Sequence, residues 1–177
     1  MRYSLRRGVL LVACLLAGLF LSASVAAEHS EDGQLLSPHP DRTARDVVGI
    51  QLEALRHNDT PSRDAGIEQV WAFAHPRNRV ITGTLSRFAR MLRGPGYSVL
   101  VNHRLHEVSA IRVGDTQAAF GVRVLAREGG FFSFLWRLER VEQPAGSVWM
   151  TTAVTPAERT GEQLTGRDLH QRRVDGD

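Results

Sequence analysis

The stretch from Phe131 to Arg140 reads FFSFLWRLER, and apolar and polar side chains alternate along it. Its alternate positions carry large apolar residues: Phe132, Phe134, Trp136 and Leu138. Arg137 and Glu139 fall between them, on the opposite face of an extended chain. A period of two predicts a β-strand with one buried face. Residues 116–125 alternate in the same way, and an antiparallel sheet of such strands needs a cover for its apolar face.

Turn residues divide the second half of the chain into strands. Gly114-Asp115 and Gly129-Gly130 stand between alternating segments and predict two hairpins. The expected strands cover residues near 97–102, 105–113, 116–125, 131–140 and 147–154.

The first half of the chain has helical spacing instead. Apolar residues recur three or four positions apart from about 42 to 57, with Gln51 among them. Shorter helices are expected over about 65–74, ending before Pro76, and over about 85–92, with Thr84 as a candidate N-cap. Residues 75–79 (HPRNR) are expected to form a loop between these helices. The predicted class is α+β, with three N-terminal helices packed on a curved antiparallel sheet of about five strands.

Residues 1–27 have the layout of a secretory signal peptide. Arginines near the start precede a mostly apolar run that closes with Ala26-Ala27, so cleavage near Ala27 and a periplasmic or secreted location are expected. Cys14 is the only cysteine, and the segment before it resembles a lipobox, so lipoprotein processing is an open alternative. No stable membrane anchor is expected.

The remaining chain is expected to hold one domain. Residues 28–41 are polar and contain Gly33, Pro38 and Pro40, which predicts a flexible leader. The cone-like α+β domain is expected over 42–157. Residues 158–177 are expected to form a disordered tail.

The charge of the chain is local. Lys and Arg number 22 against 19 Asp and Glu, but every base is Arg and three of them lie in the predicted signal. The rest is therefore neutral, which argues against a nucleic-acid partner. Residues 69–106 contain no acid but six arginines: Arg77, Arg79, Arg87, Arg90, Arg93 and Arg104. Such a block suits phosphates, carboxylates or an acidic protein face, or it is a solvated face neutralised by neighbouring acids.

Three segments resemble a family of uncharacterised domains found in bacterial exported proteins and plant plastids. They are 51–61 (QLEALRHNDTP), 71–88 (WAFAHPRNRVITGTLSRF), and the pair 136–138 (WRL) with 148–150 (VWM). The resemblance covers about residues 44–156 and implies little about activity. Helices followed by a long antiparallel sheet also look like the cone-shaped fold shared by nuclear transport factor, SnoaL-type cyclases and ketosteroid isomerases. The apolar strand faces, however, contain almost no carboxylate for isomerase chemistry.

Candidate ligand-binding residues follow from position and chemistry. They are Gln51, His75, Asn78, Arg87, Tyr97, His103, Glu107 and Trp136. Glu107 would be a plausible base if it were buried, but at a strand end it reaches water. His103, His106 and Glu107 could surround a metal only if the chain bends tightly there. We expect the two histidines to be solvated at the end of a strand instead, with no metal and no cofactor.

The function expected from the sequence is that of a non-catalytic module that binds a ligand or a protein. The ligand would be small and apolar or anionic, or the partner would be an acidic protein surface. A homodimer is plausible because the alternation places Trp149 on a face of the sheet that needs cover. The alternative is a small cone-fold enzyme with isomerase-, cyclase- or hydratase-like acid–base chemistry on a hydrophobic substrate, acting through Glu107, His103 or Tyr97.

Overall fold

The structure, a computed structural model, describes residues 35–160 of the 177-residue chain. The predicted signal peptide with Cys14, residues 28–34 of the predicted leader and residues 161–177 of the predicted tail lie outside the described residues. The helices come first, and they are α1 (Ala44–Arg56), α2 (Ala65–Ala72), α3 (Pro76–Thr82), α4 (Leu85–Leu92) and the short 3₁₀ helix η2 (Ser98–Leu100). The strands follow as β1 (Leu105–Val113), β2 (Gln117–Leu125), β3 (Phe131–Gln143), β4 (Gly146–Val154) and β5 (Glu158–Thr160).

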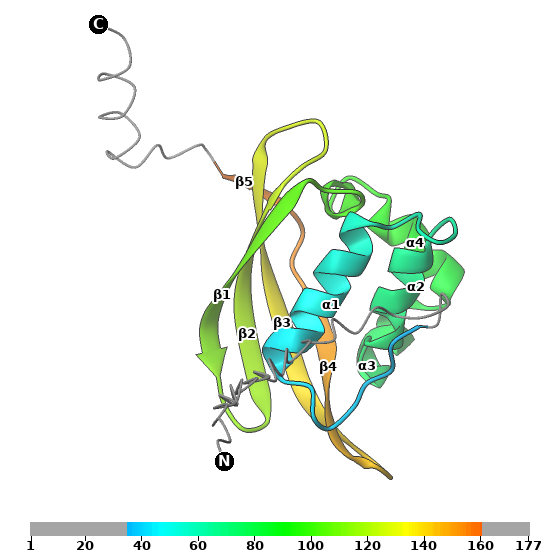
Figure 1. The fold of residues 1–177 in the computed structure, drawn as a ribbon, viewed down its shortest axis with the longest axis vertical. Helices are drawn as coiled ribbons and strands as arrows, with labels where there is room; N and C mark the ends of the chain where they lie inside the picture. The colour runs from blue at the N-terminus through cyan, green and yellow to red at the C-terminus, as the bar shows by residue number, and fades with distance from the viewer. Residues whose placement is uncertain (1–34, 161–177) are drawn as a thin grey trace, which may run out of the picture. The chain divides into compact units, whose positions relative to one another are not determined.

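The strands form one antiparallel sheet in the order β1-β2-β3-β4, and the helices lie on one side of it (Figure 1). The short β5 pairs with the start of β3, on the same edge of β3 as β4. The α+β class predicted from the sequence is therefore confirmed, as are the two hairpins around Gly114 and Gly129.

The apolar face predicted for the central strands is the core of the domain. In the register of β2 and β3, Phe120 lies opposite Trp136 and Val122 lies opposite Phe134. All four side chains are buried, together with Val48, Leu52 and Leu55 of α1. The alternation of Phe131–Arg140 therefore determines which face of the sheet the helices cover.

Short polar side chains set the starts of two helices. Thr43 and Asp46 form a capping box at α1, in which each side chain bonds the other residue's backbone N–H. The Thr84 hydroxyl accepts from the Arg87 N–H, which confirms the predicted cap of α4.

Two predicted elements need correction. The strand expected at 97–102 is wrong, because the chain forms η2 there and buries Leu100 beneath the helices. A fourth helix, α3, occupies the segment after His75 that was expected to be a loop. Helix α2 ends before Pro76 as predicted, and Pro76 begins α3, since its fixed φ and missing N–H suit the first position of a helix.

Order also extends beyond both expected ends of the domain. The Leu36 N–H and C=O bond the Gln69 carboxamide at 2.7 and 2.8 Å, so this part of the predicted leader is held against α2. At the other end, β5 takes up three residues of the predicted tail.

Trp149 does not lie on an uncovered face. Its side chain is buried in the core cluster, and the Arg140 guanidinium stacks 5.1 Å from its ring centre. The argument for a homodimer through an exposed Trp149 is therefore wrong.

Candidate functional site

A cavity of about 270 Å³ lies between the four α-helices and the β3–β4 part of the sheet. Most of its lining is apolar, with Leu55, Val70, Phe88 and Met91 among the wall residues. It opens to solvent beside α3, where Ile81 lines it although that side chain is 74% exposed. An apolar cavity that opens to solvent and is lined by a few polar groups is typical of a small-molecule site.

Gln51 lies at the base of this cavity and joins four elements. Its Oε1 accepts from Trp136 Nε1 at 2.9 Å and from the Thr151 hydroxyl at 2.7 Å, and its Nε2 donates to the Val70 carbonyl at 3.2 Å. Gln51 and Trp136 are almost fully buried. The buried amide is thus paired within the protein, which fixes the floor of the cavity.

Helix α3 forms one wall of the cavity, and polar contacts attach it to the rest of the domain. None of its residues is buried. His75 caps it through Nδ1, and Asn78, which lines the cavity, donates to the Thr151 carbonyl at 3.5 Å. Arg79 donates to the Trp71 and Ala72 carbonyls at the end of α2. Burial and the nearby Arg77 lower the pKa of His75, which favours the neutral, capping form of the ring.

Tyr97 closes the cavity near the end of β4. Its hydroxyl donates to the Val154 carbonyl at 3.1 Å, and burial raises its pKa. Four sequence candidates, Gln51, Asn78, Tyr97 and Trp136, therefore line one cavity. The structure brings them together from α1, α3, the segment before η2, and β3.

Comparison with known proteins gives a family without an assigned activity. A family model described as a domain of unknown function (DUF4864) matches residues 38–164. The chain belongs to this family. No curated protein and no solved structure matches the chain. The expected membership of an uncharacterised family is confirmed. This membership assigns no activity to the DUF4864 domain, so its function is inferred from its own residues.

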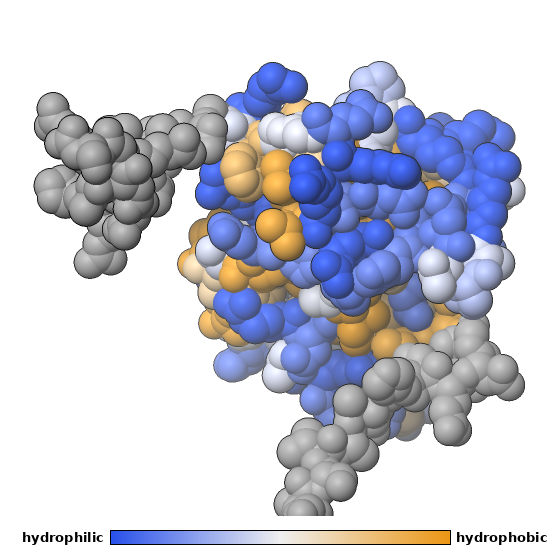
Figure 2. Space-filling view, turned by 45° about the horizontal axis from the view of Figure 1, so that its top comes forward, coloured by the Kyte–Doolittle hydropathy of each residue, from blue (hydrophilic) through white to orange (hydrophobic). Residues whose placement is uncertain are grey.

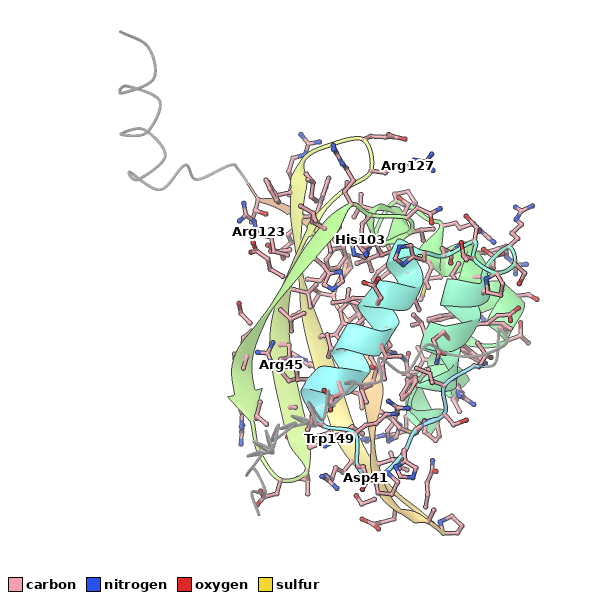
Figure 3. The ribbon with its side chains drawn as sticks, in the orientation of Figure 1. Asp41, Arg45, His103, Arg123, Arg127 and Trp149 are labelled. Carbon is pink, nitrogen blue, oxygen red and sulfur yellow. The ribbon has the colours of Figure 1, made fainter. Side chains whose placement is uncertain are left out.

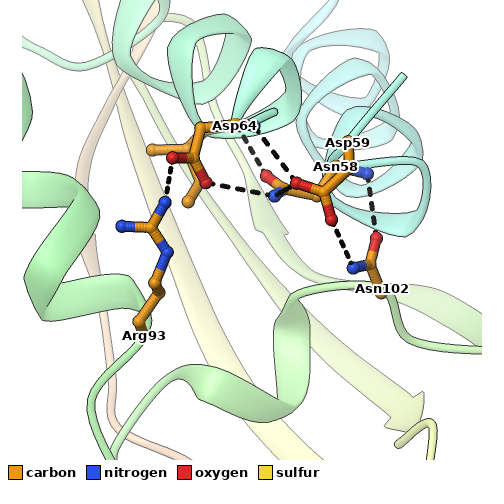
Figure 4. A network of polar contacts seen from close by, with 6 residues as sticks. Asn58, Asp59, Asp64, Arg93 and Asn102 are labelled. Atoms are coloured by element: carbon orange, nitrogen blue, oxygen red, sulfur yellow. Dashed lines mark hydrogen bonds and ion pairs between the residues drawn. The ribbon is translucent and has the colours of Figure 1, made fainter. Parts of the chain in front are cut away.

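A polar network positions the helices of the DUF4864 domain around the cavity (Figure 4). Asn58 is buried; its Oδ1 accepts from the Ile67 N–H, and its Nδ2 donates to Asp59 and Asp64. Arg93, just after α4, pairs with Asp64. The network thereby connects α1, α2 and α4, three of the cavity walls.

His103 and His106 lie away from the cavity, near the C-terminal end of α1, where Figure 3 labels His103. His103 is buried, and its Nδ1 is 2.7 Å from the Leu100 carbonyl, which can only accept. The Nδ1 therefore carries the proton, and His103 Nε2 accepts from His106 Nδ1 at 2.8 Å. The two rings contact each other because the chain turns before β1, so the prediction of a solvated His103 is wrong.

This pair makes the stability of the domain depend on pH. Burial lowers the pKa of His103, with His106 and Arg56 acting in the same direction while the Leu100 carbonyl and Glu53 oppose it. Below about pH 6.5 the unfolded chain binds a proton that the folded domain resists, so stability falls as the pH falls. We expect the unfolding free energy to be lower at pH 5.5 than at pH 7.5 on account of His103.

Chemical denaturation at the two pH values measures this dependence. His103→Asn, whose amide nitrogen takes the place of Nδ1 and can still bond the Leu100 carbonyl, should reduce the difference between them. His39→Asn should not, because His39 is exposed. If the unchanged protein and both variants showed the same pH dependence of stability, His103 would not be its cause.

Glu107 does not enter a cavity. Its carboxylate is on β1 with a side chain 74% exposed, and the nearest cation, Arg123, is 4.0 Å away. Among the described residues, no three His, Cys, Asp or Glu side chains are arranged to hold a metal ion. Within residues 35–160, no helix has the length and hydropathy needed to cross a bilayer.

The arginines of the acid-free block divide into two groups. Arg77 pairs with Glu139, Arg93 pairs with Asp64, and Arg79 bonds carbonyls, so these three act within the fold. Arg87, Arg90 and Arg104 form no ion pair within residues 35–160. The block is therefore not one uniform patch.

Sequence reasoning missed part of the lining. Thr82, Met91 and Thr151 border the cavity but carry no pattern that marks them out. The segment around α3 did carry a signal in the sequence, because it is part of the 71–88 segment that resembles the uncharacterised family. Its helical conformation was not predicted.

Proposed function

We propose that this DUF4864 domain binds a small, largely apolar molecule in the cavity above Gln51 and Trp136. The cavity itself carries the proposal: about 270 Å³ of space, open to solvent, on a floor fixed by hydrogen bonds. A cavity of about 150 Å³ accommodates benzene, so by proportion this one suits an apolar group of about ten carbons. If the N-terminal segment directs export as its sequence predicts, the binding would take place outside the cytoplasm.

The surface gives further support for a site inside the domain. Hydrophilic residues cover most of the face shown in Figure 2, and the hydrophobic ones form separate areas between them. Such a face does not present one large apolar docking area. In the cavity, by contrast, contiguous apolar side chains meet solvent.

The proposal is binding without catalysis. Tyr97 is the one titratable side chain among the described residues that line the cavity, and burial raises its pKa. Acid–base chemistry near neutral pH usually needs a group whose pKa lies near the working pH. Glu107 and His103, on which the enzyme alternative depended, do not line the cavity.

The resemblance to the cone-shaped fold is part of the same proposal. An antiparallel sheet covered on one face by helices, with an apolar cavity between the two layers, supports it. Fold likeness alone carries no activity from those families to this chain.

Filling the cavity tests the proposal. Val70 lines it and is buried, so the ring in Val70→Phe should occupy the space and weaken binding of decanol at least about ten-fold. The melting temperature of this variant should not fall, because the added atoms enter empty space.

Val80→Phe is the matched control. Val80 is 84% exposed on α3 and does not line the cavity, so decanol affinity should stay as in the unchanged protein. Calorimetric titration of the three proteins measures the effect. Absence of decanol binding to the unchanged protein, or equal binding by Val70→Phe, would overturn the proposal.

A further inference from the structure

One unpaired cation lies beside the opening of the cavity. Arg87 folds back over Gly83: a Cβ built on Gly83 would be 2.9 Å from Arg87 Cδ and 3.6 Å from its Nη1. Thr82, the neighbour of Gly83, lines the cavity, and so does Met91, one turn after Arg87 on α4. The guanidinium therefore lies next to residues that form the cavity wall.

This guanidinium has no partner among residues 35–160. Neither an ion pair nor a side-chain hydrogen bond of Arg87 occurs there, unlike Arg77, Arg79 and Arg93. None of the described residues that line the cavity is acidic, and the sequence has no acid from 69 to 106. The positive potential beside the opening is thus not neutralised locally.

We propose that the ligand is an amphiphilic anion, whose apolar chain fills the cavity and whose carboxylate is bound by Arg87. This inference rests on the proposed function and adds the chemical class of the ligand. A planar guanidinium matches a carboxylate with two parallel hydrogen bonds, and such charge-assisted bonds are stronger than neutral ones. Gly83 has a role here: its φ of 83° and missing side chain leave room for Arg87 to lie at the opening.

Decanoate and decanol separate the two parts of the site. Both carry a ten-carbon chain, but only decanoate is charged at pH 7.5. The unchanged protein should bind decanoate about ten-fold more tightly than decanol, and added salt should reduce that difference. Arg87→Gln should lower the affinity for decanoate about ten-fold and change the affinity for decanol by no more than about two-fold.

Arg90→Gln is the matched control. Arg90 is on the same helix, is exposed and has no ion pair among the described residues, but unlike Arg87 it does not lie against Gly83, the residue that follows the cavity-lining Thr82. It should bind both ligands as the unchanged protein does. If Arg90→Gln lost as much affinity for decanoate as Arg87→Gln, the attraction would come from the general positive charge of α4. That result would overturn the assignment of the carboxylate site to Arg87.

The outcomes also distinguish this inference from the proposed function. If decanol and decanoate bind equally well and Arg87→Gln changes neither, the cavity binds apolar ligands and the anionic class is wrong. If neither ligand binds, the proposed function fails and this inference fails with it.

Discussion

Gly66→Ala is expected to lower the unfolding free energy by about 3 kcal/mol or more, which places it among the most damaging single methyl additions. Gly66 is in α2, where a Cβ would lie 2.7 Å from the Ala54 carbonyl carbon and 2.8 Å from Asn58 Cα. Both atoms belong to the backbone at the end of α1, so neither can rotate away. The helices would have to separate, which also strains the hydrogen bond from the Gly66 N–H to the Asn58 carbonyl.

Gly49→Ala is the matched control for this prediction. Gly49 is inside α1, and a Cβ there would meet no atom within 4 Å. Because Ala favours a helix over Gly, the change should be neutral or stabilising by up to about 1 kcal/mol. Denaturant titrations of both variants measure the contrast. A Gly66→Ala protein as stable as Gly49→Ala would show that α1 and α2 do not pack this closely.

Gln51→Leu is expected to lower the unfolding free energy by about 3 kcal/mol. The change leaves Trp136 Nε1 and the Thr151 hydroxyl, both on buried residues, without the acceptor that both now share. Each buried donor left without an acceptor costs about 1–3 kcal/mol, while the apolar replacement recovers part of the loss.

A double-mutant cycle with Thr151→Val isolates the interaction. Thr151→Val alone should cost about 1 kcal/mol, but in the Gln51→Leu protein it should cost nothing or stabilise, since the stranded hydroxyl is then removed. Additive losses within about 0.3 kcal/mol would contradict a shared acceptor at the floor of the cavity.

The sheet could be predicted from the sequence because alternation and turn residues act locally. The register that pairs Phe120 with Trp136 follows from the hairpin around Gly129 and Gly130, both at positive φ. Helix α3 could not be predicted in the same way. Its residues bury nothing, so no apolar stripe marks it, and its stability comes from a His75 cap and from Asn78 and Arg79 contacts with distant carbonyls.

One sign of the candidate site in the sequence was a polar residue that interrupts an apolar stripe. Gln51 is such a residue, and its partners Trp136 and Thr151 are 85 and 100 positions away. That separation is set by the tertiary fold, so no local pattern could show whether Gln51 meets a ligand or a structural partner. The position of His103 was mispredicted because a regular strand was assumed there. The tight turn before β1 joins two histidines that a regular strand would separate.

Binding in the cavity above Gln51 and Trp136 is tested most directly by the indole signals of the ¹⁵N-labelled protein during a decanol titration. The chain has three tryptophans, of which Trp136 donates its indole N–H to the cavity floor, whereas Trp149 packs near the start of α1 (Figure 3). We expect the Trp136 indole signal to shift in a saturable manner while the Trp149 signal stays in place. A Trp136 signal that does not move, or shifts of equal size at Trp136 and Trp149, would contradict a ligand site in this cavity.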